Sequence, residues 1–152
     1  MLTEYIYIYI YKYELYTNIY LYICVGIGVA AQLGNEGIKN VTIIENADTH
    51  YYQPLWTLVG GGIKENTESA KPMKDIMPKG TTWIKNSAVE IKPTDNSIVL
   101  SDGSTINYDY LVVAAGVTTK WDAIPGLKSA IEGEMEGKNT GVVSIYDYNY
   151  SP

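Results

Sequence analysis

The sequence predicts an α/β fold in which a βαβ unit, a short helical insert and an antiparallel meander lead back to a buried strand. Three observations predict it. Residues 41–45 read Val-Thr-Ile-Ile-Glu, the pattern of a buried strand that ends on a carboxylate. A segment rich in Gly and Ala precedes this strand, and short β patterns follow it before the apolar run at 110–114. This order is typical of a Rossmann-like, dinucleotide-binding domain.

Size and composition narrow the function classes. The 152 residues are enough for one domain with a real core. The net charge of −6 argues against nucleic-acid binding, which needs a basic surface. Cys24 is the only cysteine, which excludes an internal disulfide, a Cys-rich metal site and a dithiol redox centre within the chain. A single histidine, His50, argues against zinc, and no apolar run reaches the roughly 18 residues that span a bilayer.

Residues 1–25 have an unusual composition. Eight of the 15 tyrosines fall between Tyr5 and Tyr22, where they alternate with isoleucine. As a polypeptide pattern this predicts a strand with a Tyr face and an Ile face. A TA dinucleotide repeat translated in frame would give the same alternation. We therefore interpret residues 1–25 as a low-complexity segment from a gene-model artefact, with a genuine edge strand or interaction arm as the alternative.

The next segment resembles half of a dinucleotide fingerprint. Residues 23–33 predict the end of a strand, a turn at Gly26 and Gly28, and a helix that stops at residues 34–37. The 19 residues from Gly26 to Glu45 match the spacing between the glycine turn and the ribose-binding acid. The complete G-x-G-x-x-G is missing, because Ala31 occupies the position of the third glycine. A glycine-tolerant turn without a ligand is the alternative.

Residues 46–80 predict a helical insert. Residues 48–50 follow the strand and should lie at its carboxyl end, where ligands bind in open α/β sheets. His50 is expected to be a hydrogen-bonded structural histidine rather than a general base, because no partner acid or nucleophile is identifiable. Pro54 suits the start of a short helix over 55–59 that ends at three glycines. We expect an exposed loop at 65–71 and a second short helix at 72–77.

Residues 81–116 are predicted to form strands joined by turns, without a helix. Short β patterns at 82–84, 88–91, 97–100 and 105–108 are separated by turn residues. The last three of these strands should form an antiparallel meander. The continuous apolar run at 110–114 predicts a strand buried on both faces. It ends near Gly116, where the missing side chain lets backbone approach a ligand.

Several of these stretches resemble mitochondrial-type sulfide:quinone oxidoreductase. They are residues 40–45, residues 50–62 with the run Tyr-Gln-Pro-Leu-Trp-Thr-Leu-Val-Gly, residues 78–80 with 83–85, and residues 108–116. The similarity extends from about residue 26 to about residue 148, and the run at 52–60 is specific to this family among its relatives.

The resemblance implies an FAD/NAD(P)-binding domain whose cofactor is FAD. Glu45 would accept from the adenosine ribose hydroxyls, and Gln53 would lie against the cofactor. Ala88 would offer backbone to the adenine end, and Gly116 would pass close to the flavin nucleotide. Gly26 would correspond to the last glycine of the fingerprint.

The resemblance also implies sulfide oxidation at a cysteine pair, with electrons passing through FAD to ubiquinone at the mitochondrial inner membrane. Residues 26–152 would be a partial FAD-binding domain, incomplete at both ends, whose membrane-associating region and redox cysteines are missing. We expect no catalytic residue, no metal site and no nucleic-acid partner in this chain, and little activity or FAD retention from the chain alone. The alternatives are part of an NADH:quinone dehydrogenase-type flavoprotein, or a non-enzymatic truncated module.

Overall fold

The computed structural model describes residues 8–11, 23–114, 116, 119–133 and 141–150. The chain divides into two compact units, and each is described by itself. The first unit comprises Met1–Asp48 and Pro72–Val117, and the second comprises Thr49–Lys71 and Thr118–Pro152.

A four-stranded sheet is the centre of the first unit. Its strand order is β5-β2-β1-β9. The strands are β1 (Ile8–Tyr11), β2 (Val41–Ile44), β5 (Thr82–Ile84) and β9 (Tyr110–Val113). The helices α1 (Ile23–Asn35) and α3 (Met73–Ile76) belong to the same unit. So does the three-stranded sheet of β6 (Ala88–Lys92), β7 (Ser97–Leu100) and β8 (Thr105–Asn107).

Strand β1 comes from the Tyr/Ile segment and lies between β2 and β9. It pairs with both in the antiparallel sense, with Ile8 opposite Ile44 and Val113, and Tyr11 opposite Val41 and Tyr110. By contrast, β2 and β5 are parallel. The alternative of an edge strand is therefore wrong for residues 8–11, because they occupy an interior position in the sheet.

Helix α1 begins earlier than the sequence predicts. Gly26 and Gly28 are helical, so the strand end and turn expected at 23–28 are wrong. A glycine inside a helix costs only about 1 kcal/mol, and the surrounding apolar and Ala residues outweigh that. The predicted stop is confirmed: Gly37, at φ 77°, ends the helix with bonds from the Ile38 N–H to the Leu33 carbonyl and from its own N–H to the Gly34 carbonyl.

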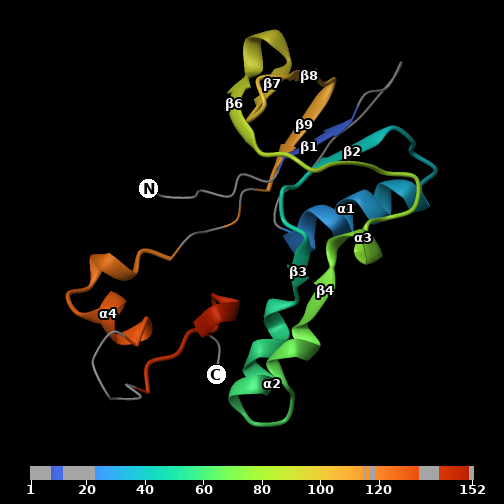
Figure 1. Ribbon diagram of the computed structural model, residues 1–152. Helices are drawn as coiled ribbons and strands as arrows, with labels where there is room; N and C mark the ends of the chain where they lie inside the picture. Colours follow the sequence, from blue (N-terminus) through green and yellow to red (C-terminus); the bar gives the residue numbers. More distant parts are fainter. Residues whose placement is uncertain (1–7, 12–22, 115, 117–118, 134–140, 151–152) are drawn as a thin grey trace. The chain divides into compact units, whose positions relative to one another are not determined.

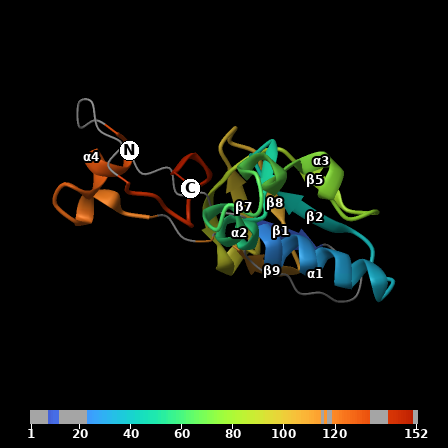
Figure 2. The same ribbon diagram turned by 90° about the horizontal axis from the view of Figure 1, so that it is seen from below.

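Two buried clusters show that the four-stranded sheet is covered on both faces. On one face, Ala30 of α1 packs with Val41, Ile43 and Ala114. On the other face, Ile44 packs with Ala88 and with residues of β7. Residues 43 and 44 point to opposite faces because side chains alternate along a strand. Both views of the ribbon show α1 running along one side of β2 and β1 (Figures 1 and 2).

Strand β9 is less buried than predicted. Tyr110 is 40% exposed, and residues 111–113 are only partly buried. The apolar run predicted a strand buried on both faces, whereas β9 is the last strand in the sheet order. An edge position leaves one flank of the strand open.

The three-stranded sheet is antiparallel throughout. Strand β7 pairs with β6 on one side and β8 on the other, and a β-bulge interrupts β6 between Ala88 and Glu90. A 3-10 turn at Pro93–Asp95 and Asn96 in the left-handed conformation, at φ 46°, connect β6 to β7. Asn tolerates this conformation better than most residues.

The second unit contains the helical insert. Strands β3 (Thr49–Tyr51) and β4 (Ala70–Pro72) pair with each other, and the 3-10 turn η1 (Gln53–Leu55) leads into α2 (Trp56–Gly60). This confirms the short helix predicted at 55–59. Its later elements are the 3-10 turns η4 (Trp121–Ala123) and η5 (Tyr148–Tyr150), and the helix α4 (Leu127–Ile131).

Residues 65–71 are mostly exposed, as predicted, but they do not form a loop. Residues Asn66–Ser69 form a 3-10 turn, η2, which a capping box between Glu65 and Glu68 stabilises, and β4 follows directly. Ser69 is buried and receives a hydrogen bond from the Trp56 indole N–H at 3.0 Å. The polar composition concealed a turn whose side chains bond to their own backbone.

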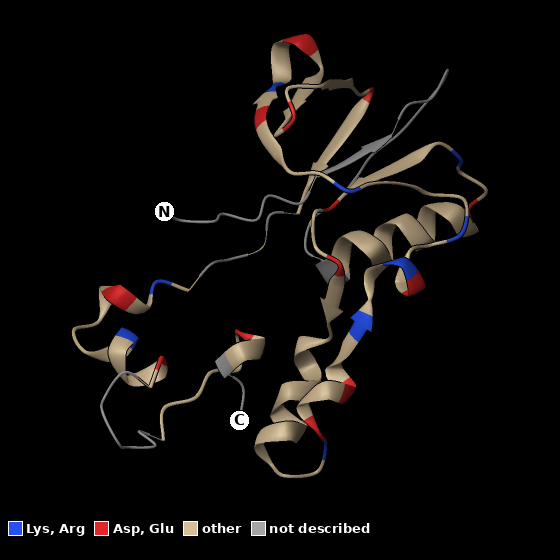
Figure 3. Cartoon of the chain, viewed as in Figure 1, with Lys and Arg blue, Asp and Glu red and all other residues tan. Residues whose placement is uncertain are grey.

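Charged residues lie mainly in turns and at the ends of elements (Figure 3). Helix α1 contains no Lys, Arg, Asp or Glu along its 13 residues. Within the described ranges, no helix has both the length and the apolar character needed to cross a membrane.

Candidate functional site

Glu45 follows β2 at the carboxyl edge of the sheet and is only 3% exposed. Two bonds to β5 hold its backbone. Its N–H donates to the Ile84 carbonyl at 3.1 Å, and its carbonyl accepts from the Trp83 indole N–H at 2.9 Å. The position of this acid is therefore set by the neighbouring parallel strand as well as by β2.

The Glu45 carboxyl group is bonded to the backbone of its own loop. Oε1 accepts from the Ala47 N–H at 2.5 Å. Burial raises the pKa of Glu45 from 4.5 to about 7, and the backbone N–H groups of Ala47 and Asn46 offset part of that rise. Near neutral pH the carboxyl group is thus poised between its neutral and ionised forms.

Charged and polar groups surround the ends of β2 and β5. The Lys85 ammonium lies 2.6 Å from Asp48 Oδ1, in an exposed ion pair that joins the loops after the two strands. Ala88, which begins β6, is 5% exposed and belongs to the same buried cluster as Ile44. Glu45 and Ala88 therefore lie in one region of the first unit.

Gly116 lies at the same edge of the sheet as Glu45. It follows β9. Val113 of β9 and Ile44 of β2 both pair with Ile8 of β1, so β9 and β2 end at the same edge. The φ of 68° at Gly116 is a conformation that favours glycine. Gly26 is buried in the first turn of α1. Because α1 returns to the start of β2, its first turn faces the carboxyl edge, so the structure brings Gly26, Glu45, Ala88 and Gly116 toward one end of the sheet.

The phosphate-binding turn of a βαβ unit is not formed by the described residues. In that unit the carboxyl end of the first strand leads directly through a glycine turn into the helix. Here the carboxyl end of β1 is Tyr11, which pairs with Val41 and Tyr110, the first residues of β2 and β9. The reversed β1 thus ends at the sheet edge opposite Glu45.

Gln53 belongs to the second unit, where its side chain has a partner. Its Nε2 donates to the Ile145 carbonyl at 2.8 Å. Nearby in the same unit, the Tyr51 and Tyr148 rings stack with centroids 4.1 Å apart. Tyr51, at the end of β3, and Gln53 therefore contact the chain's own residues 145–148.

His50 is buried in β3, with 7% of its surface exposed. Burial lowers the pKa of its imidazole, which favours the neutral form at pH 7. Among the described residues, no group of three or more His, Cys, Asp or Glu side chains is arranged to hold a metal ion.

Trp83 belongs to the site but was not predicted as a site residue. Residues 82–84 were predicted as a strand and residues 83–85 carry part of the family resemblance, whereas the structure adds that the Trp83 indole bonds to the backbone of Glu45. A useful signal was available: buried Trp normally finds a partner for its N–H. The Lys85–Asp48 pair was also missed, since 37 residues separate its members.

Comparisons with known proteins agree with this fold. The family described as pyridine nucleotide-disulphide oxidoreductase matches residues 25–147. The mitochondrial sulfide:quinone oxidoreductase of Dictyostelium discoideum is 48% identical over 124 residues, which cover 80% of this chain and 26% of that protein. The mouse protein of the same name is 36% identical over 109 residues, covering 72% of this chain and 24% of its own length.

The chain therefore spans about a quarter of the length of the curated relatives it matches. Among solved structures, a chain in the mitochondrial ATP synthase of Tetrahymena thermophila superposes with a TM-score of 0.61 at 15% identity, covering 93% of this chain and 36% of that one. At that identity the likeness concerns the fold alone. The chain belongs to the pyridine nucleotide-disulphide oxidoreductase family and is a homologue of the mitochondrial sulfide:quinone oxidoreductases.

Proposed function

We propose that this chain is the FAD-binding part of a mitochondrial flavoprotein that oxidises sulfide and passes electrons through FAD to ubiquinone at the inner membrane. The observation that carries the proposal is the buried Glu45 carboxyl group at the carboxyl end of β2. An acid at this position accepts hydrogen bonds from ribose hydroxyls in βαβ dinucleotide sites. The 48% identity to a named sulfide:quinone oxidoreductase supports the same assignment.

Each residue has a proposed part in holding the cofactor. Glu45 binds the adenosine ribose, and the backbone of Ala88 contacts the adenine end. Gly116 lets the chain pass close to the flavin nucleotide, Gly26 lets α1 pack closely, and Gln53 lies against the cofactor. The β6-β7-β8 sheet is then the meander insert of an FAD-binding domain that covers residues 26–152.

The described residues suit the adenosine of FAD better than its pyrophosphate. A carboxylate can accept about four hydrogen bonds, and the backbone N–H groups of Asn46 and Ala47 use only part of that capacity. Because Glu45 is 3% exposed, however, its side chain must turn outward to meet a ribose. The reversed β1 offers no glycine turn for the pyrophosphate. For both reasons we expect this chain alone to bind FAD weakly.

When bound, FAD supplies the electron-transfer chemistry, and the residues of this chain bind and orient its adenosine end. The single cysteine, Cys24, cannot form the cysteine pair on which sulfide oxidation depends. The chain alone is therefore expected to be inactive.

Ligand titration tests the proposal. ADP-ribose shares with FAD the ADP moiety, whose adenosine ribose Glu45 would contact. It is titrated by calorimetry into the wild type, Glu45→Gln and Glu90→Gln, a control on an exposed glutamate of β6. We expect weak, saturable binding that falls at least about tenfold in Glu45→Gln and is unchanged in the control. Equal affinity of wild type and Glu45→Gln would overturn the role of Glu45. Stoichiometric flavin after gel filtration would contradict weak retention.

A further inference from the structure

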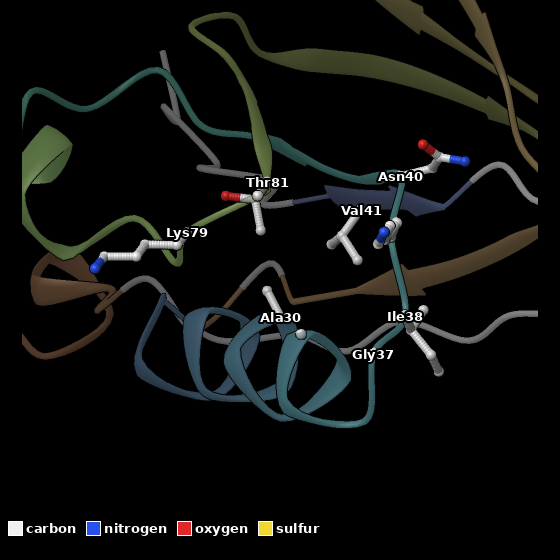
Figure 4. Close-up of a pocket in the computed structure, with 10 residues that line it drawn as sticks. Ala30, Gly37, Ile38, Asn40, Val41, Lys79 and Thr81 are labelled. Atoms are coloured by element: carbon white, nitrogen blue, oxygen red, sulfur yellow. The ribbon is translucent and has the colours of Figure 1, made fainter.

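A cavity of about 430 Å³ lies in the first unit at the sheet edge opposite Glu45. It is bounded by the carboxyl-terminal half of α1, the turn into β2 and the turn into β5. The floor residue Ala30 comes from α1, Val41 is the first residue of β2, and Thr81 directly precedes β5 (Figure 4). The cavity is within the range of about 300–1,000 Å³ that holds small ligands.

More of the cavity's lining surface is apolar than polar. Ala30 and Val41, which are 1% and 2% exposed, close its floor, and Figure 4 shows them pointing toward the same space. The Thr81 hydroxyl donates to the Pro78 carbonyl at 2.7 Å, which leaves its methyl group to line the wall. A ligand with an apolar body suits this lining.

Small residues leave the space unfilled. Gly34 lines the cavity, and a Cβ added there would meet nothing closer than the Lys79 carbonyl at 4.0 Å. Gly37 and Gly80 are further lining residues without side chains.

The rim of the cavity is positively charged. Lys39 and Lys79 line it, no Asp or Glu is among its described lining residues, and neither lysine forms an ion pair with another described residue. In Figure 4 the Lys79 side chain runs outward from the rim, so a rotamer change would bring its ammonium over the mouth. The last turn of α1 opposes an anion only weakly, because the Leu33 and Gly34 carbonyls already accept backbone bonds.

We propose that this cavity binds an organic anion with a short apolar body, in the chemical class of medium-chain carboxylates. The hydrocarbon chain lies over Ala30 and Val41, and the carboxylate meets the ammonium groups of Lys79 and Lys39. An inorganic anion would leave the apolar interior uncovered, and a neutral hydrocarbon would not use the rim charges. The site is independent of the proposed cofactor site, because the two lie at opposite edges of the sheet.

Titration of octanoate into the chain, followed by NMR chemical-shift changes, tests the proposal. We expect saturable shifts at residues 30–41 and 79–81. Gly34→Leu, which fills the cavity from a helical position, should weaken binding at least about tenfold. Gly28→Leu makes the same exchange at an exposed site of α1 with no atom within 4 Å and should leave affinity unchanged.

Charge recognition has its own test, which does not depend on filling the cavity. Octanol has the same chain without the charge and should bind more weakly than octanoate. Lys79→Gln should weaken that preference, because only Lys39 then remains at the rim, whereas Lys74→Gln, an exposed control on α3, should keep it. The proposal is overturned if octanoate does not saturate, if Gly28→Leu and Gly34→Leu bind alike, or if octanol and octanoate bind equally to the wild type.

Discussion

Replacing Glu45 by Gln should remove a pH dependence of folding that one buried carboxyl group creates. The pKa of Glu45 is about 7 in the folded chain, against 4.5 for an unperturbed glutamate. Between these values the unfolded chain has lost its proton while the folded chain keeps it, so stability falls as pH rises and the loss is complete above pH 7. Each pKa unit is worth about 1.4 kcal/mol, so ionised Glu45 costs the fold about 3 kcal/mol.

Urea unfolding followed by Trp fluorescence at pH 5 to 8 measures this effect. The difference in unfolding free energy between Glu45→Gln and wild type should shift by about 2–3 kcal/mol across that range, in favour of the variant at the higher pH. Comparing the two proteins at each pH cancels the contribution of their other titrating groups. Glu36→Gln, at an exposed position after α1, controls for the loss of one negative charge.

A carboxyl ¹³C titration gives the pKa of Glu45 directly. A midpoint below about 5.5, or a free-energy difference that stays constant with pH, would refute the reasoning that burial dominates this group. The same protonation has a consequence for ligand binding. Ribose hydroxyls donate hydrogen bonds, so the affinity for ADP-ribose should rise from pH 6 to pH 8 as Glu45 ionises.

Three further predictions concern single contacts. Trp83→Phe removes the indole bond to the Glu45 carbonyl. It should lower the unfolding free energy by about 1 kcal/mol and weaken ADP-ribose binding. An unchanged affinity would show that Trp83 does not position Glu45. Gly37→Ala, at φ 77° just after α1, should lower the unfolding free energy by about 1 kcal/mol, while Gly28→Ala within α1 should raise it by about 0.5–1 kcal/mol. Effects of the same sign in urea unfolding would contradict this account. Ser69→Ala leaves the Trp56 indole N–H without its buried acceptor and should cost about 1–3 kcal/mol, with a red shift of Trp emission as the local readout.

Local chemistry explains which elements could be predicted. Pro54 and the three glycines after it bracket α2, and turn residues at 93–96 and 101–104 separate the strands of the β6-β7-β8 sheet. These signals act over a few residues and are visible in any sequence. The errors at 23–28 and 65–71 arose where local signals compete, since glycines within a helix and polar residues within a capped turn both resemble loops.

The candidate site was predictable in part, where it depends on signals that are local in the sequence. Spacing and the strand pattern identified Glu45, and the structure puts it at the carboxyl edge with Ala88 and Gly116. Trp83 was not identifiable as its partner, because the bond joins residues 38 positions apart through strand pairing.

The sequence by itself determined the family, the order of the elements and the acid that ends β2, since these depend on residue type and on spacing along the chain. Only the tertiary structure decided the direction of β1, the edge position of β9 and the raised pKa of Glu45. Strand direction depends on which backbone groups meet across the sheet, and the pKa depends on how much water the packed neighbours exclude. Both are properties of distant residues brought together, and no local pattern encodes them.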